Sequence, residues 1–347
     1  WQTGCWRVCL SGEMLKRKVF RMRILSADDI RRAVTMPDAI EAVASAFVQL
    51  STGRAVVPLR AHLQQRAHES HTFVMPALLE ESGGLGLKVV SVFPHNAARH
   101  GLPRIHALVT ILDAATGRPA AVLEGSYLTA LRTGAASGAA TRALARADAR
   151  VLAVIGAGAQ APQQVEAVCA VRPIERVIIV NRNRERAERL AAWLREHSMT
   201  SAIDIVSSAA AAIPQADIIC CATSSPTPVF DDADLRPGTH INGIGSFTPR
   251  MVEVPPETVG RAYVVVDQQT AAWAEAGDLQ HARSLGLLDE SQTVELGAVL
   301  AGRSPGRTSD EQITFFKSVG NAVQDIAVAQ LALGEAERLG LGVEATL

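Results

Sequence analysis

A glycine-rich turn behind a short apolar run is the first part of this sequence that could do chemistry. Residues 151–155 predict a buried parallel strand, and Gly156, Gly158 and Ala161 follow it in the spacing G-x-G-x-x-A. The glycines allow a tight turn and a close approach to a pyrophosphate, while the small alanine lets the next helix pack against the strand. That helix would point its free N–H groups at the phosphates. The pattern predicts a dinucleotide site.

The end of the next predicted strand indicates which dinucleotide would bind. An NAD-specific site normally has an acidic residue about 20 positions after the glycines, where it holds the ribose 2′-hydroxyl. This chain has Asn181 there, followed by Arg182 and Arg184. A neutral amide and nearby cations can hydrogen-bond a 2′-phosphate and neutralise its charge. The sequence therefore favours NADPH, with NADH as the alternative. If this interpretation is wrong, Arg182 and the arginines after it are only the solvated face of a helix.

Composition excludes several other classes of protein. The 347 residues include 34 Lys and Arg against 35 Asp and Glu, a net charge of −1, so neither a nucleic-acid footprint nor a basic membrane patch is indicated. No uncharged apolar run approaches the roughly 20 residues of a membrane span. The five cysteines lack the paired spacing of a metal site, and we expect no bound metal. We expect a cytoplasmic protein, with residues 1–21 as an extension outside the fold.

The elements that must position these residues fall into two groups. Strand-like runs between residues 56 and 124 predict an antiparallel sheet, preceded by helices after Ser26 and through residues 40–50. A helix over residues 126–145 then leads into alternating strands and helices, which are typical of a doubly wound parallel sheet. The expected strands of the first group are 56–63, 71–75, 86–93, 106–113 and 120–124. Those of the second are 151–155, 177–180, 203–206, 218–221, 240–244 and 263–267.

This order predicts an α/β fold with a discontinuous first domain. Residues 22–130 together with 315–347 would form an α+β domain for substrate binding and dimerisation, because a helix over residues 325–339 should return and pack on it. Residues 131–314 would form the Rossmann domain.

Several separated motifs resemble the ornithine cyclodeaminase and mu-crystallin family. They are G-L-K at 86–88, L-T-A-L-R-T-G-A-A-S at 128–137, G-A-G-A-Q-A at 156–161, H-I-N-G-I-G-S-F-T-P at 240–249 and F-K-S-V-G-N-A-V-Q-D at 316–325. The resemblance extends from residue 22 to about residue 339. It implies a Rossmann domain and a sheet-based domain that forms a homodimer, with the active site between them.

The resemblance also implies roles for three cations. Arg60 and Arg132 match the arginines that hold the substrate carboxylate, and Lys88 matches the lysine in the site. A guanidinium fork suits a carboxylate, and a lysine beside an imine can supply a proton. Without the resemblance, Lys88 would be interpreted as an edge or snorkelling lysine and Arg132 as a helix-surface arginine.

On the cofactor side, the resemblance places two residues at the pyrophosphate, Asn181 at the adenosine ribose, Thr223 after the fourth strand, and residues 242–245 near the nicotinamide. Ser318 and Val319 should close over the ring, with Val319 also contacting substrate. For Thr223 the alternative is an ordinary polar loop. The full predicted cofactor set is Thr133, Gly156, Gly158, Ala159, Gln160, Asn181, Arg182, Thr223, Asn242, Gly243, Ile244, Gly245 and Ser318.

Two departures from the family pattern bear on the reaction. Cyclodeaminating members carry an aspartate where this chain has Phe247, and Arg104 stands where a threonine or serine usually follows G-L-P. A phenylalanine cannot activate water or an amine. The resemblance therefore favours the reductive branch, in which NADPH reduces a cyclic ketimine carboxylate, pyrroline-2-carboxylate or its six-membered homologue, to proline or pipecolate.

Other functions stay open at this point. One is an amino-acid or opine dehydrogenase, and another is a cyclodeaminase whose acid has moved, with His95, His100 and His106 as candidates near the lysine strand. A third is a protein that binds NADPH and a small carboxylate without turnover. In every case the expected partner is a small imino or amino acid.

Overall fold

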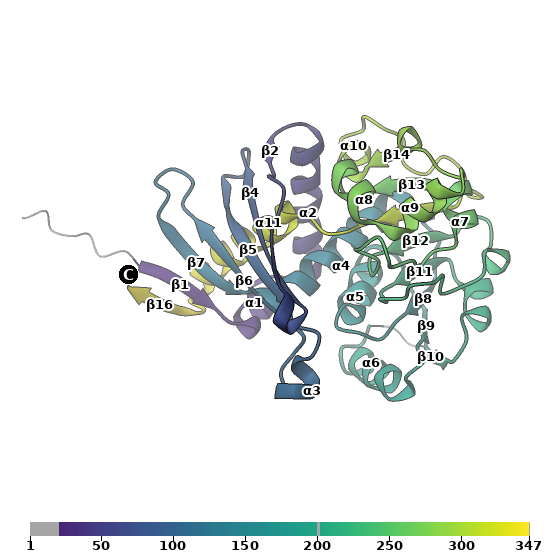
Figure 1. The fold of residues 1–347 in the computed structure, drawn as a ribbon, viewed down its shortest axis with the longest axis horizontal. Coiled ribbons are helices and arrows are strands. Elements are labelled where there is room, and N and C mark those ends of the chain that lie inside the picture. Colours follow the sequence, from purple (N-terminus) through teal and green to yellow (C-terminus); the bar gives the residue numbers. More distant parts are fainter. Residues whose placement is uncertain (1–20, 200–201, 347) are drawn as a thin grey trace, which may run out of the picture.

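The computed structural model describes residues 21–199 and 202–346, which form two sheets of eight strands each. Figure 1 shows the first sheet at one end of the molecule and the second at the other, with helices α2 (Met36–Ser51), α4 (Gly125–Leu144) and α11 (Ala322–Leu339) between them. The expected α/β architecture with a Rossmann-type sheet is confirmed.

The first sheet has the order β16-β1-β7-β6-β5-β4-β2, and β3 pairs with β4. Its neighbours run antiparallel, as predicted, except that β1 and β7 are parallel. The expected strand over 56–63 is instead two strands, because Pro58 lies between them and cannot donate to a ladder. The strands are β1 Arg21–Leu25, β2 Ala55–Val56, β3 Ala61–Gln65, β4 Ser70–Leu79, β5 Gly84–Val92, β6 Ile105–Leu112, β7 Pro119–Glu124 and β16 Val343–Thr346.

Helices cover the face of this sheet that is turned toward the second sheet. Helix α1 (Ala27–Ala33) starts in a capping box between Ser26 and Asp29, and α2 is capped by Thr35. Phe47, Leu123 and Ile326 are fully buried in the shared core. A short helix, α3 (Asn96–His100), lies in the connection between β5 and β6.

The second sheet is wholly parallel, in the order β10-β9-β8-β11-β12-β15-β13-β14. The chain order reverses between β8 and β11, the place where doubly wound sheets bind ligands at their carboxyl edge. The strands are β8 Val151–Ile155, β9 Arg176–Val180, β10 Ala202–Val206, β11 Ile218–Cys221, β12 His240–Gly243, β13 Tyr263–Val266, β14 Thr293–Glu295 and β15 Thr314–Lys317. The remaining α-helices are α5 Ala161–Val171, α6 Arg184–Glu196, α7 Pro256–Arg261, α8 Gln269–Glu275, α9 Gly277–Ser284 and α10 Leu296–Leu300. The 3-10 turns are Arg66–His68, Ala209–Ala211, Ile213–Gln215, Asp232–Asp234 and Glu290–Gln292.

The expected segment boundaries differ from the elements in three places. Residues 315–317 belong to β15, which pairs with β12 and β13, so the chain returns to the first sheet only after Lys317. This short run, Thr314–Lys317, carries no turn signal of its own and escaped the sequence analysis. Helix α4 runs across the expected boundary at 130 and 131. Arg21, expected in the N-terminal extension, is the first residue of β1, and the rest of that extension lies outside the described residues.

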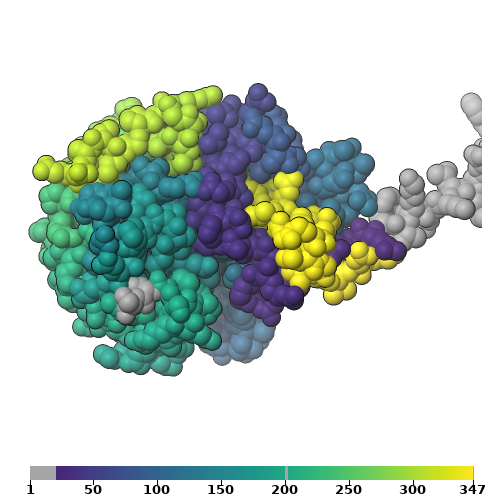
Figure 2. Space-filling model, turned by 180° about the vertical axis from the view of Figure 1, so that it is seen from behind, coloured from purple at the N-terminus to yellow at the C-terminus, as the bar shows by residue number. Residues whose placement is uncertain are grey.

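The two ends of the described chain lie side by side. Figure 2 shows the purple N-terminal residues against the yellow C-terminal ones, and the pairing of Met22 with Ala345 in β1 and β16 accounts for this. In the described part of the chain, no helix is both long and apolar enough to cross a membrane.

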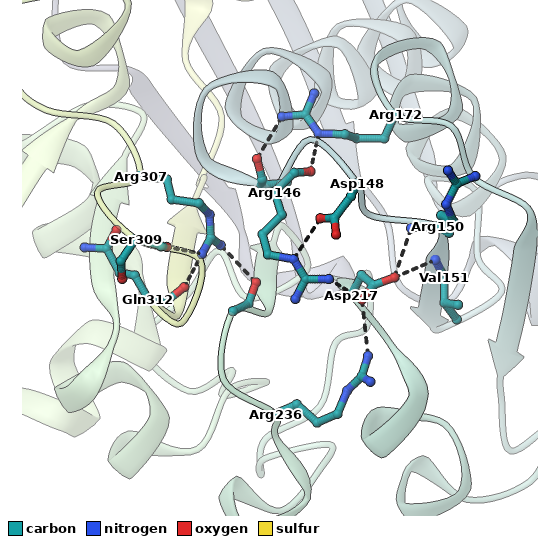
Figure 3. Close-up of polar contacts among 12 residues, drawn as sticks. Arg146, Asp148, Arg150, Val151, Arg172, Asp217, Arg236, Arg307, Ser309 and Gln312 are labelled. Carbon is teal, nitrogen blue, oxygen red and sulfur yellow. Dashed lines mark hydrogen bonds and ion pairs between the residues drawn. The ribbon is translucent and has the colours of Figure 1, made fainter.

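A group of arginines anchors the end of α4 to the second sheet (Figure 3). Arg172 donates to the carbonyls of Thr141 and Ala145 at 3.0 and 2.8 Å, and Arg307 donates to that of Leu144 at 2.7 Å. Cations at a helix C-terminus satisfy its free carbonyls and stabilise its dipole. Because α4 also carries Arg132, this anchor fixes a candidate site residue relative to the second sheet.

Candidate active site

Three charged side chains from three different elements meet between the two sheets. The ammonium of Lys88, on β5, lies 2.8 Å from Oδ2 of Asp325, on α11. Arg132, on α4, donates from Nε to Oδ1 of the same carboxylate at 2.9 Å. All three are buried, with exposed fractions of 2%, 6% and 0% for Lys88, Arg132 and Asp325. Two cations share one carboxylate, so the cluster carries an excess positive charge that would attract an anion.

Glycines allow these elements to approach one another. A Cβ at Gly86 would lie 2.3 Å from the Thr110 carbonyl and 2.9 Å from Ile326, so only glycine lets α11 come this close to the sheet. Lys88 is two residues further along β5 on the same face, which brings it to Asp325. Gly320 has φ +86°, and a Cβ there would lie 3.0 Å from Arg132. Close packing thus explains why glycine stands in the motifs G-L-K and S-V-G.

The surroundings of Lys88 favour proton transfer near neutral pH. Burial lowers its pKa, Arg132 lowers it further and Asp325 opposes the shift, so that the pKa falls to about 8. An acid with a pKa near the working pH is an efficient proton donor. Gln324, beside Asp325, accepts a hydrogen bond from Arg132, while its own Nε2 is buried without a partner among the described residues. A ligand oxygen would satisfy that donor.

Arg60, the third predicted cation, joins the two halves of the molecule. It donates from Nη2 to Oε2 of Glu275 on α8 at 2.8 Å, and its guanidinium lies 5.9 Å from the centre of the Phe73 ring. Its charge also contributes to the lowered pKa of Lys88. Burial raises the pKa of Glu275, and Arg60 counteracts this. The structure therefore brings the three predicted cations into one region, with Arg60 held by a carboxylate.

Asp325, Gln324 and Glu275 are functional candidates to which the sequence patterns assign no role. Asp325 is the last residue of the motif F-K-S-V-G-N-A-V-Q-D, which was a signal for it, but its position was interpreted only as the beginning of a helix. Glu275 lies in a helical stretch without a distinguishing motif.

The predicted glycine turn has the expected form at the end of β8. Gly156 has φ +102°, and a Cβ there would lie 2.6 Å from the Ala222 carbonyl, whereas Gly158 has no neighbouring atom within 4 Å of that position. Backbone at Gly158 is thus open to a ligand. Oε1 of Gln160 is buried with no hydrogen-bond partner among the described residues. The tight turn at Gly156 and the open backbone at Gly158 fit a dinucleotide pyrophosphate at the start of α5.

A pocket of about 430 Å³ opens beside this turn. Helix α6 forms its other wall with two arginines and a tryptophan. The lining residues are Ala157, Gly158, Ala159, Pro162, Arg186, Arg189, Leu190 and Trp193. Arg182, which the sequence analysis preferred over the later arginines as the phosphate contact, is exposed and does not line this pocket, whereas Arg186 and Arg189 do.

Asn181 connects the two turns that border the pocket. Its Oδ1 accepts from the backbone N–H of Ala157 at 3.2 Å, and its Nδ2 donates to the Asn183 carbonyl at 2.6 Å. Asn181 is the residue expected to face the ribose. Both its side-chain oxygen and its side-chain nitrogen are hydrogen-bonded to the protein backbone.

Residues at the ends of β11 and β12 also come together. A Cβ at Gly245 would lie only 2.0 Å from the Thr223 carbonyl, and one at Gly156 would lie 3.0 Å from the Thr223 side chain. Gly243 and Ile244 lie just before Gly245 and are buried. The predicted residues of three strand ends thus form one continuous edge.

The Asn242 side chain is hydrogen-bonded within the protein. Asn242 is fully buried and donates to Oγ1 of Thr141 at 2.9 Å, while its own Oδ1 lies 3.2 Å from Nε2 of His240. The side chain thus points to α4, and the placement of Asn242 near the nicotinamide stays a prediction. Thr133 is also engaged within α4, since its hydroxyl donates to the Thr129 carbonyl.

The segment after β15 is held by a buried carboxylate. Oδ2 of Asp267 accepts from the Ser318 hydroxyl at 2.8 Å and from the N–H groups of Val319 and Gly320 at 2.9 and 2.8 Å. Ser318 and Val319 therefore adjoin Gly320, which lies against Arg132.

The two departures from the family pattern lie at the surface. Phe247 is 44% exposed, and Arg104 is exposed. His95 pairs with Glu69 at 2.9 Å. His106 faces the side of the first sheet opposite to Lys88, because Lys88 pairs with Val109, an odd number of residues away. His106 is therefore not the relocated acid.

Together, a Rossmann-type sheet, a glycine turn and a buried lysine between arginines define a protein of the dinucleotide-binding class with an anion-attracting site. Residues 21–338 match the model of the ornithine cyclodeaminase/mu-crystallin family, and the chain belongs to that family.

Similar proteins cover nearly the whole chain. It is 43% identical over 323 residues to a Delta(1)-pyrroline-2-carboxylate reductase of Bacillus cereus, covering 92% of this chain and 98% of the relative. The Thermococcus litoralis Delta(1)-pyrroline-2-carboxylate reductase, solved with NADH and L-proline, is 39% identical with a TM-score of 0.88, covering 93% and 99%. An archaeal alanine dehydrogenase dimer with bound NAD is 33% identical with a TM-score of 0.86, covering 94% and 99%.

Proposed function

We propose that this protein is an oxidoreductase that uses NAD(P)H to reduce a cyclic ketimine carboxylate, pyrroline-2-carboxylate or piperideine-2-carboxylate, to L-proline or L-pipecolate. The observation that carries the proposal is the buried cluster of Lys88, Arg132 and Asp325, which combines a proton donor with an unbalanced positive charge. The two reductases named above are similar to this chain over more than nine-tenths of its length.

Each residue of the cluster has a separate role in this reaction. Arg132 and Arg60 bind the substrate carboxylate, because guanidinium groups match its geometry. Lys88 keeps the imine nitrogen protonated, and Asp325 positions both Lys88 and Arg132. A nicotinamide cofactor held at the glycine turn would supply the hydride. Since hydride transfer neutralises the cationic imine, the protein contributes mainly position and electrostatics.

The loop after β12 argues against ammonia elimination from ornithine. Phe247 in that loop offers no carboxylate, and it is 44% exposed. An amino-acid dehydrogenase is the second candidate, since the alanine dehydrogenase is also similar over most of the chain. A cyclodeaminase and a binding protein without turnover are the remaining alternatives.

For the cofactor we propose NADPH, with NADH as the alternative. Arg186 and Arg189 in the pocket beside the glycine turn support this choice, since two cations would stabilise a 2′-phosphate. Arg189 also pairs with Glu185, which reduces its free charge. Arg186 is therefore the stronger candidate, with exposed Arg182 nearby in the sequence.

A homodimer is proposed from the outer face of the first sheet. Ile24 pairs with Val343 and Val122, and Leu108 pairs with Val89, so these apolar side chains share the face opposite to Lys88. Ile24, Leu108 and Val343 are 44%, 41% and 67% exposed. Several exposed apolar side chains on one face of a sheet support an interface there. Light scattering should give a dimer, and Leu108→Glu should give a monomer.

A cytoplasmic location stays a proposal from composition, to be tested by cell fractionation.

The test of function measures NADPH and NADH oxidation with pyrroline-2-carboxylate and piperideine-2-carboxylate, beside ammonia release from L-ornithine with NAD. Oxidation that depends on a ketimine, without ornithine turnover, supports the proposal. Ammonia and proline from ornithine would overturn it. Reduction of pyruvate with ammonia, in the absence of ketimine reduction, would favour the dehydrogenase.

A further inference from the structure

A second buried charge cluster, separate from Lys88, lies beneath the strand ends that are proposed to bind the cofactor. It consists of Glu253, which follows the loop after β12, Asp278 in the first turn of α9, and Lys317 at the end of β15. All three side chains are fully buried, with exposed fractions of 0%. None of them has a part in the proposed reaction.

The Glu253 carboxylate binds backbone N–H groups of two loops. Oε1 accepts from Thr223 at 2.6 Å, and Oε2 accepts from Gly245 and Ser246 at 2.7 and 2.8 Å. Thr223 follows β11, and Gly245 and Ser246 follow β12. One carboxylate therefore joins the two loops across the edge of the sheet, next to Gly156 of the glycine turn.

Asp278 and Lys317 hold Glu253 in place. Oδ1 of Asp278 accepts from the N–H groups of Glu253 and Val254 at 2.6 and 3.1 Å, and Oδ2 lies 2.9 Å from the Lys317 ammonium. The cluster contains two carboxylates and one ammonium. Its second negative charge is balanced by the backbone N–H groups of the loops, and both Glu253 oxygens accept these bonds at full strength only while the carboxylate is ionised.

We propose that Glu253 is a positioning residue whose ionised carboxylate holds the Thr223 and Gly245 loops in the geometry that binds the nicotinamide cofactor, so that cofactor affinity falls when this group is protonated. The inference rests on the proposed function only in taking these loops as cofactor-binding.

Protonation of Glu253 would occur in an accessible pH range. Burial raises its pKa, Lys317 on β15 opposes the shift, Asp278 on α9 adds to it, and the pKa is about 7. The Cys221 thiol on β11 also lies in the field of these groups, and burial raises its pKa well above the usual value. A proton on either Glu253 oxygen would compete with the N–H donor bound there, and that oxygen would become a weaker acceptor for the corresponding loop.

The test is the dissociation constant of NADH, followed by fluorescence between pH 6.0 and 8.5. NADH is the probe because the 2′-phosphate of NADPH titrates itself near a pH of about 6. The wild-type protein should bind NADH about tenfold more weakly at the acid end, the size expected for the loss of a charge-assisted hydrogen bond. Glu253→Gln should bind weakly throughout, without this pH dependence. The control is Glu257→Gln, an exposed carboxylate on α7, which should behave as wild type.

Two further variants separate this account from general damage to the fold. Lys317→Met removes a positive charge that favours ionised Glu253. The pH at which NADH affinity is half lost should therefore rise. Asp278→Asn removes a negative charge that disfavours ionised Glu253, so the pH at which NADH affinity is half lost should fall. If Glu253→Gln does not fold, these opposite shifts still decide the matter. A wild-type affinity that is constant with pH, or shifts in the same direction for both variants, would overturn the proposal. Since no ketimine is present, this outcome is independent of the proposed reaction.

Discussion

Two buried lysine–aspartate pairs with nearly the same geometry lie in different surroundings. Lys88 and Asp325 are 2.8 Å apart, and Lys317 and Asp278 are 2.9 Å apart. Lys88 and Lys317 are the only lysines among the described residues. A buried ion pair alone therefore does not indicate a function, and the third charge beside each pair must be considered.

The third charge differs in sign between the two clusters. Arg132 joins the first pair and leaves an excess positive charge, which an anionic ligand can balance. Glu253 joins the second and leaves an excess negative charge, which backbone N–H groups already balance. The first cluster is thus suited to bind substrate and the second to fix the protein backbone. The predictions below test this difference.

The largest effect is expected from Lys88→Met. Loss of a positioned proton donor typically reduces turnover by about 10²- to 10⁴-fold. The methionine can fill the site without a charge, so the dissociation constant for NADH should change little. Steady-state kinetics and a fluorescence titration measure the two quantities. If affinity for NADH fell as strongly as turnover, Lys88 would belong to cofactor binding and the contrast between the clusters would fail.

Asp325→Asn should reduce stability as well as activity. It leaves Lys88 and Arg132 buried without their shared counter-ion, a change that commonly costs about 3–5 kcal/mol. Urea denaturation at neutral pH gives the free energy of unfolding. Asp28→Asn is the control, because that carboxylate is exposed and pairs with Arg31 of the same helix. A free energy of unfolding equal to that of wild type would show that Asp325 does not balance the two cations.

Arg60→Gln should raise the KM for the ketimine by about tenfold or more, since charge-assisted bonds to a carboxylate are worth roughly 1.5–3 kcal/mol. Glu275→Gln is the matched variant, because it releases Arg60 without removing it. It should leave KM the same or lower it. An increase in KM for both variants would indicate that the ion pair itself, and not the free guanidinium, shapes the site.

The smallest effect concerns cofactor choice. Arg186→Gln should lower affinity for NADPH several-fold and leave NADH affinity unchanged, because the pocket loses one of its two cations. Arg195→Gln is the control, since Arg195 is exposed in the last turn of α6 and does not line the pocket. An unchanged ratio of the two affinities would remove the reason for preferring NADPH.

Elements set by local sequence were predictable, whereas contacts between residues far apart in the chain were not. Strands at residues 151–155 and 218–221 were predicted with their observed bounds, since each is a continuous apolar run. Thr314–Lys317 was missed because four residues without turn signals carry little information. By contrast, the predicted cations Arg60, Lys88 and Arg132 do lie in one region of the structure.

The carboxylates that govern both clusters could not have been found from spacing alone. Asp325 acts on Lys88 and Arg132 through contacts between three elements far apart in the chain, and Glu253 acts on loops whose N–H groups have no sequence signature. Asn242 shows a related limit. Its position at a strand end was predictable, but the bond of its side chain to Thr141 on α4 depends on a partner about a hundred residues away.

The most direct test of the account is the alkaline side of the pH profile of ketimine reduction, compared between wild type and Lys88→Arg at saturating NADPH. The Lys88 pKa of about 8 predicts that wild-type turnover falls as pH rises through that value, because the proton donor is lost. Arginine keeps its charge throughout this range, so the residual activity of Lys88→Arg should not show the decline. The same decline in both proteins would assign it to the substrate and contradict the role of Lys88.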